Sequence, residues 1–135
     1  MLKCNYMDIN GRADMETNEL LLFADAQESL PLYLAFREMM MQWFPDVEIK
    51  AAKTQITFKA RYGFAFVSLP RRKRDRGGVM VSFGLPERVE SPRIWQVSEP
   101  YPNRWTHHAV VTCREEIDEE LKGWIHAAYS FALIK

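Results

Sequence analysis

The sequence predicts an α+β domain in which helices cover one face of an antiparallel meander of about four to five strands. Three patterns support this fold class. Apolar residues recur at helical spacing before residue 45, apolar and polar residues alternate between residues 53 and 111, and helical spacing returns after residue 112. We therefore expect one or two helices, then the strands, then a C-terminal helix.

The length of the chain fits a single domain. It has 135 residues and a mass of 15.8 kDa, and no internal repeat or glycine- and serine-rich linker divides it. Residues 1–16 show no clear period. We therefore expect a loosely ordered N-terminal extension over residues 1–16 and one domain over residues 17–135.

Two helices are expected before the sheet. Residues 20–24 suggest a short helix, and Ser29 followed by Pro31 provides an N-cap and a first-turn proline for a second one. The second helix should end before Pro45. Its apolar stripe consists of residues three or four apart, namely Tyr33, Phe36, Met40, Trp43 and Phe44.

A period of two begins near residue 53 and indicates strands. Residues 53–61 alternate between an apolar face and a basic, polar face, which is typical of a half-buried strand. Residues 64–69 and 79–85 then predict a hairpin whose long tip spans residues 70–78. Two further strands are expected at residues 94–97 and 105–111, with a proline-containing loop at residues 99–103 between them.

The C-terminal helix has the clearest signal. Thr112 and Glu115 fit a capping box, so the helix should begin there. Its apolar stripe consists of Ile117, Leu121, Trp124, Ile125, Ala128 and Ala132. The acidic stretch at residues 115–120 resembles a metal-binding helix face, but capping and the positive helix N-terminus explain it better. We predict no metal site.

Composition excludes several classes of protein. The chain has 18 basic and 18 acidic residues, so it is neither a wholly basic nucleic-acid binder nor an acidic disordered chain. Cys4 and Cys113 lie far apart and do not indicate a disulfide framework or a zinc site. There is no signal peptide or membrane-spanning run, and we expect a cytoplasmic protein that does not enter a membrane.

The balanced total hides a segregation of charge along the chain. Residues 1–49 carry 3 basic and 9 acidic residues, whereas residues 50–76 carry 9 basic residues and 1 acidic residue. The C-terminal residues 114–135 are acidic again, with 3 basic and 5 acidic residues. A positive segment therefore lies between two negative ones.

Several short segments together resemble the DUF5655 family of domains of unknown function. They are KTQITF at residues 53–58, FAFV at 64–67, LPER at 85–88, RWTHH at 104–108, EIDEEL at 116–121 and WIHAAY at 124–129. The likeness extends over about residues 30–131. The fold is also similar, more loosely, to YjbR-like and YdhG-like small domains. The resemblance implies an architecture and assigns no reaction.

The hairpin tip is the strongest candidate for contact with a partner. Five cations fall within six residues there, namely Arg71, Arg72, Lys73, Arg74 and Arg76. Such a loop could neutralise phosphates, and Lys59 and Arg61 would extend the positive surface along the open sheet face. Trp95, Tyr101 and Trp105 offer aromatic rings on which bases could stack, although aromatic residues at sheet positions more often pack in the core. The sequence therefore suggests a binding module for nucleic acid or another polyanion, although a solvated turn explains the run equally well.

Two alternatives come from other classes of protein. One is a small-ligand binder or enzyme whose pocket would be formed by Lys53, Gln55, Thr57, Arg88, Arg104, Trp105 and His108. The other is an interaction subunit or homodimer in which the acidic and basic segments of two chains attract each other. We find no catalytic motif and name no catalytic residue or cofactor. His107 alternates with His108 and should face the edge of the core.

Overall fold

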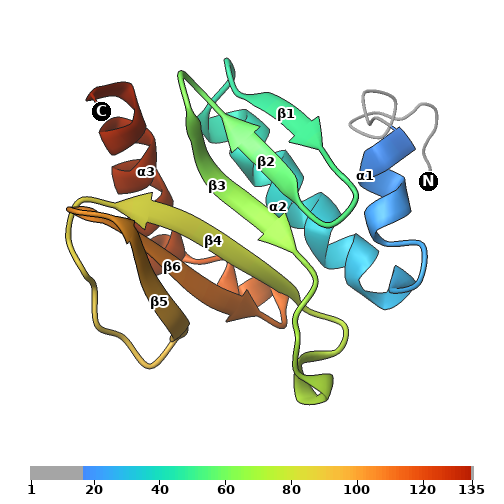
Figure 1. Ribbon diagram of the computed structural model, residues 1–135. Coiled ribbons are helices and arrows are strands. Elements are labelled where there is room, and N and C mark those ends of the chain that lie inside the picture. Colours follow the sequence, from blue (N-terminus) through green and yellow to red (C-terminus); the bar gives the residue numbers. More distant parts are fainter. Residues whose placement is uncertain (1–16, 135) are drawn as a thin grey trace.

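The computed structural model describes residues 17–134, so the prediction for residues 1–16 lies outside the described part of the chain. The expected α+β architecture is confirmed. A six-stranded antiparallel sheet carries the helices on one face, and the opposite face is open (Figure 1). The helices are α1 (Thr17–Leu22), α2 (Leu30–Trp43) and α3 (Glu119–Ile134). The strands are β1 (Glu48–Ala51), β2 (Ile56–Lys59), β3 (Gly63–Ser68), β4 (Val79–Leu85), β5 (Ile94–Tyr101) and β6 (Arg104–Val111).

The strand order is β1-β2-β3-β4-β6-β5, which departs from a simple meander at one end. β4 pairs with β6, and β5 lies outside β6 at the edge of the sheet. The sheet also has one more strand than expected. β1 alternates between polar and apolar residues, but it is only four residues long, which is too short for the pattern to identify a strand.

The core lies between the sheet and the helices α2 and α3. Phe36 of α2 meets the ring of Phe58 on β2 edge to face, with 5.7 Å between ring centroids. Trp124 of α3 stacks on Phe83 of β4 at 5.5 Å. Apolar burial on one face of each strand therefore fixes which face the helices cover.

A β-bulge adjusts this pattern at the start of β3. Lys59 pairs with Gly63 and Phe58 pairs with Ala65, so β3 has one extra residue, Phe64. Phe64 and Ala65 are adjacent in sequence and yet both are buried. The bulge lets both side chains enter the core, where Phe64 contacts Tyr129 of α3.

Both expected helix caps differ from the prediction. The Ser29 hydroxyl makes no cap and instead donates a hydrogen bond to the Gly78 carbonyl at 2.7 Å. Thr112 bonds through its amide to Glu116, not to Glu115. A 3₁₀ turn at Arg114–Glu116 comes first, and α3 begins at Glu119, where the Asp118 carboxylate accepts from the Leu121 amide at 3.1 Å. Ser29 therefore makes a long-range contact in place of a cap, and a 3₁₀ turn separates Thr112 from the start of α3.

A buried polar cluster joins α1 to α2. Arg37 donates from Nε to Glu19 Oε1 at 2.9 Å, and the Tyr33 hydroxyl donates to the same oxygen. All three side chains are buried. Burial and the Glu19 carboxylate raise the pKa of Tyr33, so its phenol stays neutral. The cluster positions α1 against α2.

Among residues 17–134, no helix is both long and apolar enough to cross a bilayer.

Candidate functional site

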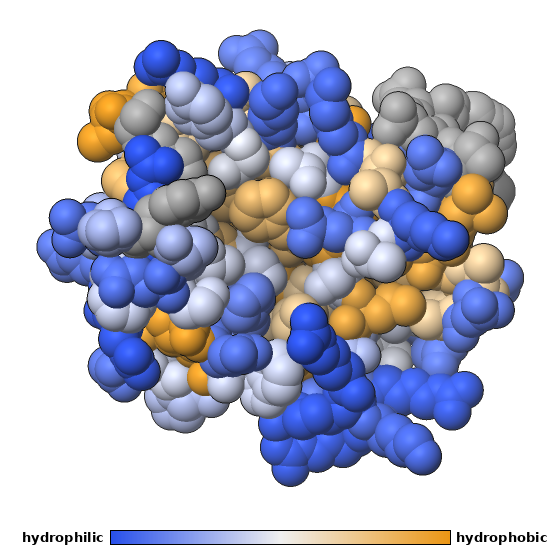
Figure 2. All heavy atoms as spheres, viewed as in Figure 1, coloured by the Kyte–Doolittle hydropathy of each residue, from blue (hydrophilic) through white to orange (hydrophobic). Residues whose placement is uncertain are grey.

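The predicted hairpin tip forms an ordered loop, here called the basic loop (residues 70–78), between β3 and β4. Lys73–Asp75 form a 3₁₀ turn. The Asp75 amide donates to the Arg72 carbonyl at 3.0 Å, and the Gly78 amide donates to the Asp75 carbonyl at 2.9 Å. In Figure 2 this loop is the strongly hydrophilic lobe at the bottom of the molecule. The backbone bonds give the cations a defined scaffold.

Two contacts attach the basic loop to the connection between α1 and α2. The buried Ser29 hydroxyl bonds to the Gly78 carbonyl, and Arg76 Nε lies 2.6 Å from Glu28 Oε2. Gly77 has a φ of 91°, which favours glycine. A Cβ on Gly78 would lie 2.5 Å from the Val111 carbonyl oxygen, so this position has no room for a side chain. The loop is therefore fixed at its C-terminal end.

The five cations of the basic loop fall into two groups. Arg72 pairs with Asp75 at 2.7 Å and also lies over the Trp95 ring, with 5.6 Å from its guanidinium carbon to the ring centroid. Arg76 pairs with Glu28. The other three, Arg71, Lys73 and Arg74, are exposed and form no ion pair with any residue in the described part of the chain. Two cations hold the loop, and three face solvent.

A shallow hollow of about 250 Å³ lies between the basic loop and the α1–α2 connection. Its lining is mixed in charge. The loop contributes Arg71, Arg72, Lys73 and Arg76, and the connection contributes Asp25 and Glu28. The cations outnumber the carboxylates, and the hollow opens widely to solvent.

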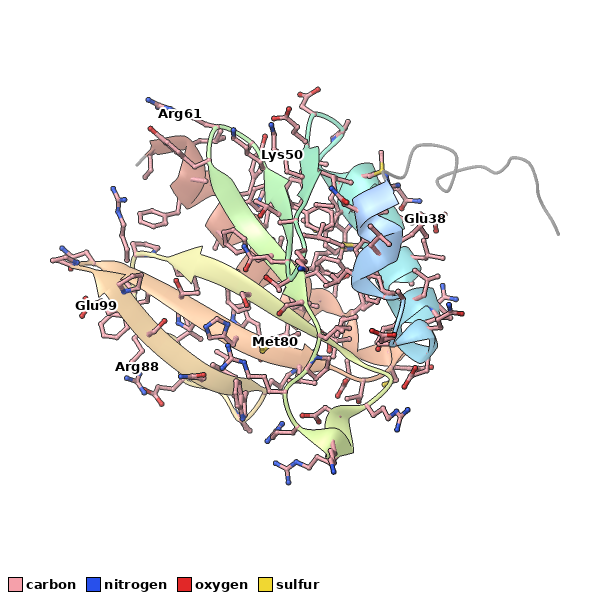
Figure 3. All side chains as sticks on the ribbon, turned by 45° about the vertical axis from the view of Figure 1, so that its right-hand side comes forward. Glu38, Lys50, Arg61, Met80, Arg88 and Glu99 are labelled. Carbon is pink, nitrogen blue, oxygen red and sulfur yellow. The ribbon has the colours of Figure 1, made fainter. Side chains whose placement is uncertain are left out.

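Lys59 and Arg61 lie at the other end of the sheet from the basic loop. Lys59 pairs with Gly63 at the start of β3, whereas the loop follows Ser68 at its end. Figure 3 shows Arg61 at the top, beside the β2–β3 turn, with the basic loop at the bottom. At about 3.3 Å per residue, the length of β3 separates the two positions by more than about 15 Å. They do not form one continuous surface.

The residues of the alternative pocket also divide between the two ends of the sheet. Lys53 and Gln55 belong to the β1–β2 turn, where the Ala52 amide bonds to the Gln55 carbonyl, rather than to an extended strand. This turn lies at the same end as the basic loop, because Ile56 pairs with Val67 and Val67 with Val81.

The remaining residues of that pocket lie elsewhere. Trp105 pairs with Leu85 at the opposite end of β4, and the Arg88 guanidinium lies 5.9 Å from the centroid of the Trp105 ring. Arg104 begins β6 beside Trp105. Thr57 is in the middle of β2, three strands away from β6. One pocket does not unite these side chains.

His108 lies on the open face of the sheet beside the basic loop. Its Nδ1 is 2.6 Å from Ser82 Oγ on β4, and its register partner on β5 is Gln96. Burial lowers the pKa of His108, and the nearby Arg71 and His107 lower it further. His108 is half-buried, so part of this residue still reaches solvent. The sequence offered no signal for Ser82, because only strand pairing brings it to His108.

His107 points the other way, into the core, as the alternation predicts. It is fully buried and stacks on Phe83 with 5.4 Å between ring centroids. The Val89 amide donates to His107 Nε2 at 2.9 Å, so the neutral ring carries its proton on Nδ1. Burial lowers the pKa of His107. We assign this residue a structural role.

The acidic stretch at residues 115–120 is occupied by structural contacts. Arg93, just before β5, lies 2.8 Å from Asp118 and 3.1 Å from Glu120, and it also donates to the Glu116 carbonyl. Within residues 17–134, no three metal-binding side chains gather at one point. The contacts between Arg93 and this acidic stretch join the start of β5 to the start of α3.

Comparison with known proteins agrees with the resemblance noted in the sequence. Residues 21–132 match DUF5655, described as a domain of unknown function. No curated protein and no solved structure matches the chain. Because the match covers most of the domain, the chain belongs to the DUF5655 family.

Proposed function

We propose that this protein is a binding module for a phosphate-bearing polyanion, with nucleic acid as the class of partner, and that the basic loop makes the contact. The observation that carries the proposal is the loop's three exposed cations that form no ion pair within residues 17–134, Arg71, Lys73 and Arg74, on a scaffold fixed by Ser29 and Asp75. A surface charged only for solubility does not require such a scaffold. Fixed cations lose less conformational entropy when they bind a phosphate backbone.

The neighbouring sheet face adds groups that suit nucleic acid. Trp95 is half-buried under Arg72, and Gln96 and His108 supply hydrogen-bonding groups beside it. An aromatic ring and polar side chains next to a positive loop are the usual parts of a single-strand binding surface. The proposal therefore expects binding that tolerates many sequences and weakens with salt.

Two variants with equal charge change test the proposal. The first replaces the three exposed loop cations, as Arg71→Ala, Lys73→Ala and Arg74→Ala. The matched control replaces three cations away from the basic loop, as Lys50→Ala, Lys59→Ala and Arg61→Ala; Figure 3 shows Lys50 and Arg61 near the top of the molecule and the basic loop at the bottom. Both variants remove three positive charges, so a difference between them reports position and not net charge.

Binding is measured by fluorescence anisotropy with labelled single- and double-stranded DNA and RNA over a range of salt. We expect the loop variant to lose about tenfold or more in affinity, and its slope of log K against log salt to fall by about 2 to 3. The control should lose less than about threefold. Equal losses in the two variants would contradict the proposal, as would no binding by the wild-type protein.

A further inference from the structure

The two adjacent histidines have hydrogen-bond partners with opposite properties. His107 Nε2 accepts from the Val89 amide, which is a fixed donor. Protonation of His107 would place two hydrogens against each other and break that bond. His108 Nδ1 is paired instead with the Ser82 hydroxyl, which can donate to a neutral ring or rotate and accept from a protonated one. Only the second partner allows the ring to change its charge in place.

The surroundings of His108 keep it neutral while the site is empty. Burial lowers the pKa of His108 most, and Arg71 of the basic loop and His107, whose ring lies on the other face of the same strand, lower it further. From β4 and β5 the facing groups are Ser82 and Gln96, which are both uncharged. A phosphate bound to Arg71 would offset the repulsion between the Arg71 guanidinium and a protonated His108 ring. The same anion would then favour the protonated ring directly.

Resting on the proposed function, we infer that His108 is a proton-coupled phosphate contact. A phosphodiester group held by Arg71 also accepts a hydrogen bond from the exposed edge of His108. The ring takes up one proton as the phosphate binds, and Ser82 accepts the Nδ1 hydrogen that results. The basic loop and the open sheet face then form one anion site, whose affinity increases as the pH falls.

The physical consequence is a linkage between binding and pH. When a group binds its proton more tightly in the complex than in the free protein, affinity rises as the pH falls between the two pKa values. The lowered pKa of free His108 sets the acidic end of this window. For one proton, affinity increases by up to about tenfold for each pH unit.

The probe is an oligothymidylate of about a dozen nucleotides, without terminal phosphates and with a pH-insensitive rhodamine dye. Its phosphodiesters do not change charge between about pH 8 and about pH 6, whereas a terminal phosphate would. Anisotropy titrations compare the wild-type protein with His108→Gln, which keeps hydrogen-bonding ability and cannot gain the charge. His126→Gln is the matched control, because it removes an exposed histidine from α3, on the helical side of the sheet.

We expect wild-type affinity to increase at least about threefold between about pH 7.5 and about pH 6. His126→Gln should behave in the same way, and His108→Gln should show little pH dependence. In nuclear magnetic resonance titrations, the pKa of the His108 ring should increase when the oligonucleotide is added.

The outcomes separate this inference from the proposed function. Wild-type binding that does not vary with pH would overturn the role of His108, and so would an unchanged pH profile in His108→Gln; the proposed function would stand in both cases. A wild-type protein that binds no probe at any pH overturns both. If His108→Gln does not fold, the shift of the wild-type ring pKa on binding decides the question alone.

Discussion

His107 contributes to the pH dependence of the protein's stability. Its pKa is lowered by burial in the folded state, so the unfolded chain binds a proton that the folded chain does not. Stability is therefore fully present above about pH 6.5 and decreases as the pH falls through the folded pKa. The maximum slope is about 1.4 kcal/mol per pH unit for one proton.

We expect His107→Phe to remove this part of the slope. The phenyl ring can still stack on Phe83, but the Val89 amide loses its acceptor, at a cost of about 1 to 3 kcal/mol near neutral pH. Urea unfolding of both proteins at several pH values between about 7.5 and about 5 measures the slopes. Parallel profiles for the two proteins would contradict the assignment.

Gly78 provides a second prediction at the residue scale. A methyl group there meets backbone atoms of Val111 and Asp75, which cannot move aside as a flexible side chain would. Gly78→Ala should destabilise the fold by about 2 kcal/mol or more. The matched control is Gly84→Ala on β4, the strand that follows Gly78, where a Cβ meets nothing within 4 Å. Thermal melts that fall equally for the two variants would be inconsistent with the close approach at Gly78.

At the scale of elements, the basic loop depends on a helix that is distant in sequence. Ser29 and Gly78 are 49 residues apart, and their bond is buried. Ser29→Ala leaves the Gly78 carbonyl without this donor, and we expect a loss of about 1 to 3 kcal/mol. Faster amide hydrogen exchange in residues 72–78 should accompany it.

The nearby Glu28→Gln is the control for Ser29→Ala. It weakens an exposed ion pair whose Arg76 side chain is 81% accessible, so its effect on stability should be smaller than that of Ser29→Ala. If Glu28→Gln loosens the loop as much as Ser29→Ala does, the buried bond is not the main attachment.

α3 provides another prediction for an element. Asp118 caps the helix and pairs with Arg93, and these contacts lower the pKa of its carboxyl. This contribution is present above about pH 4 and is lost as the pH falls through the lowered pKa. Asp118→Ala should cost about 1 kcal/mol at neutral pH, and Thr112→Ala less than about 0.5 kcal/mol, in urea unfolding. A larger loss of stability in Thr112→Ala than in Asp118→Ala would instead indicate that Thr112 provides the main cap.

The sequence predicts elements well where burial alternates strongly. On β6, the buried residues His107, Ala109 and Val111 alternate with half-buried neighbours, and this strand begins within one residue of its predicted start. β1 has a weaker signal, because it spans only four residues and none of them is fully buried. β2 proved shorter than predicted because the alternating pattern continues into a turn at Gln55.

At the scale of the whole molecule, the separation of charge along the chain is partly cancelled by folding. The acidic N-terminal segment brings Glu28 to Arg76, and the acidic C-terminal segment brings Asp118 to Arg93. These contacts join residues far apart in sequence, which explains why sequence patterns alone did not identify the hollow or the Ser82–His108 pair. Periodicity in the sequence predicts local elements, whereas the contacts of a site depend on which strands pair with each other.

The same contacts bear on self-association. Because Glu28 and Arg76 pair within one chain, part of the attraction expected between the acidic and basic segments of two chains is already satisfied. We therefore expect light scattering to give the mass of a single chain at both low and moderate salt. A mass that doubles at low salt would support the homodimer instead.

The insertion of β6 between β4 and β5 has a consequence for how the protein is made. During synthesis β5 leaves the ribosome before β6, its neighbour in the sheet, while the edge of β4 must stay free for the same strand. A nascent or truncated chain that ends before residue 104 thus exposes two unpaired strand edges, which are sites of mispairing and aggregation. The sheet can be completed only after β6 has been synthesised and has paired with both β4 and β5.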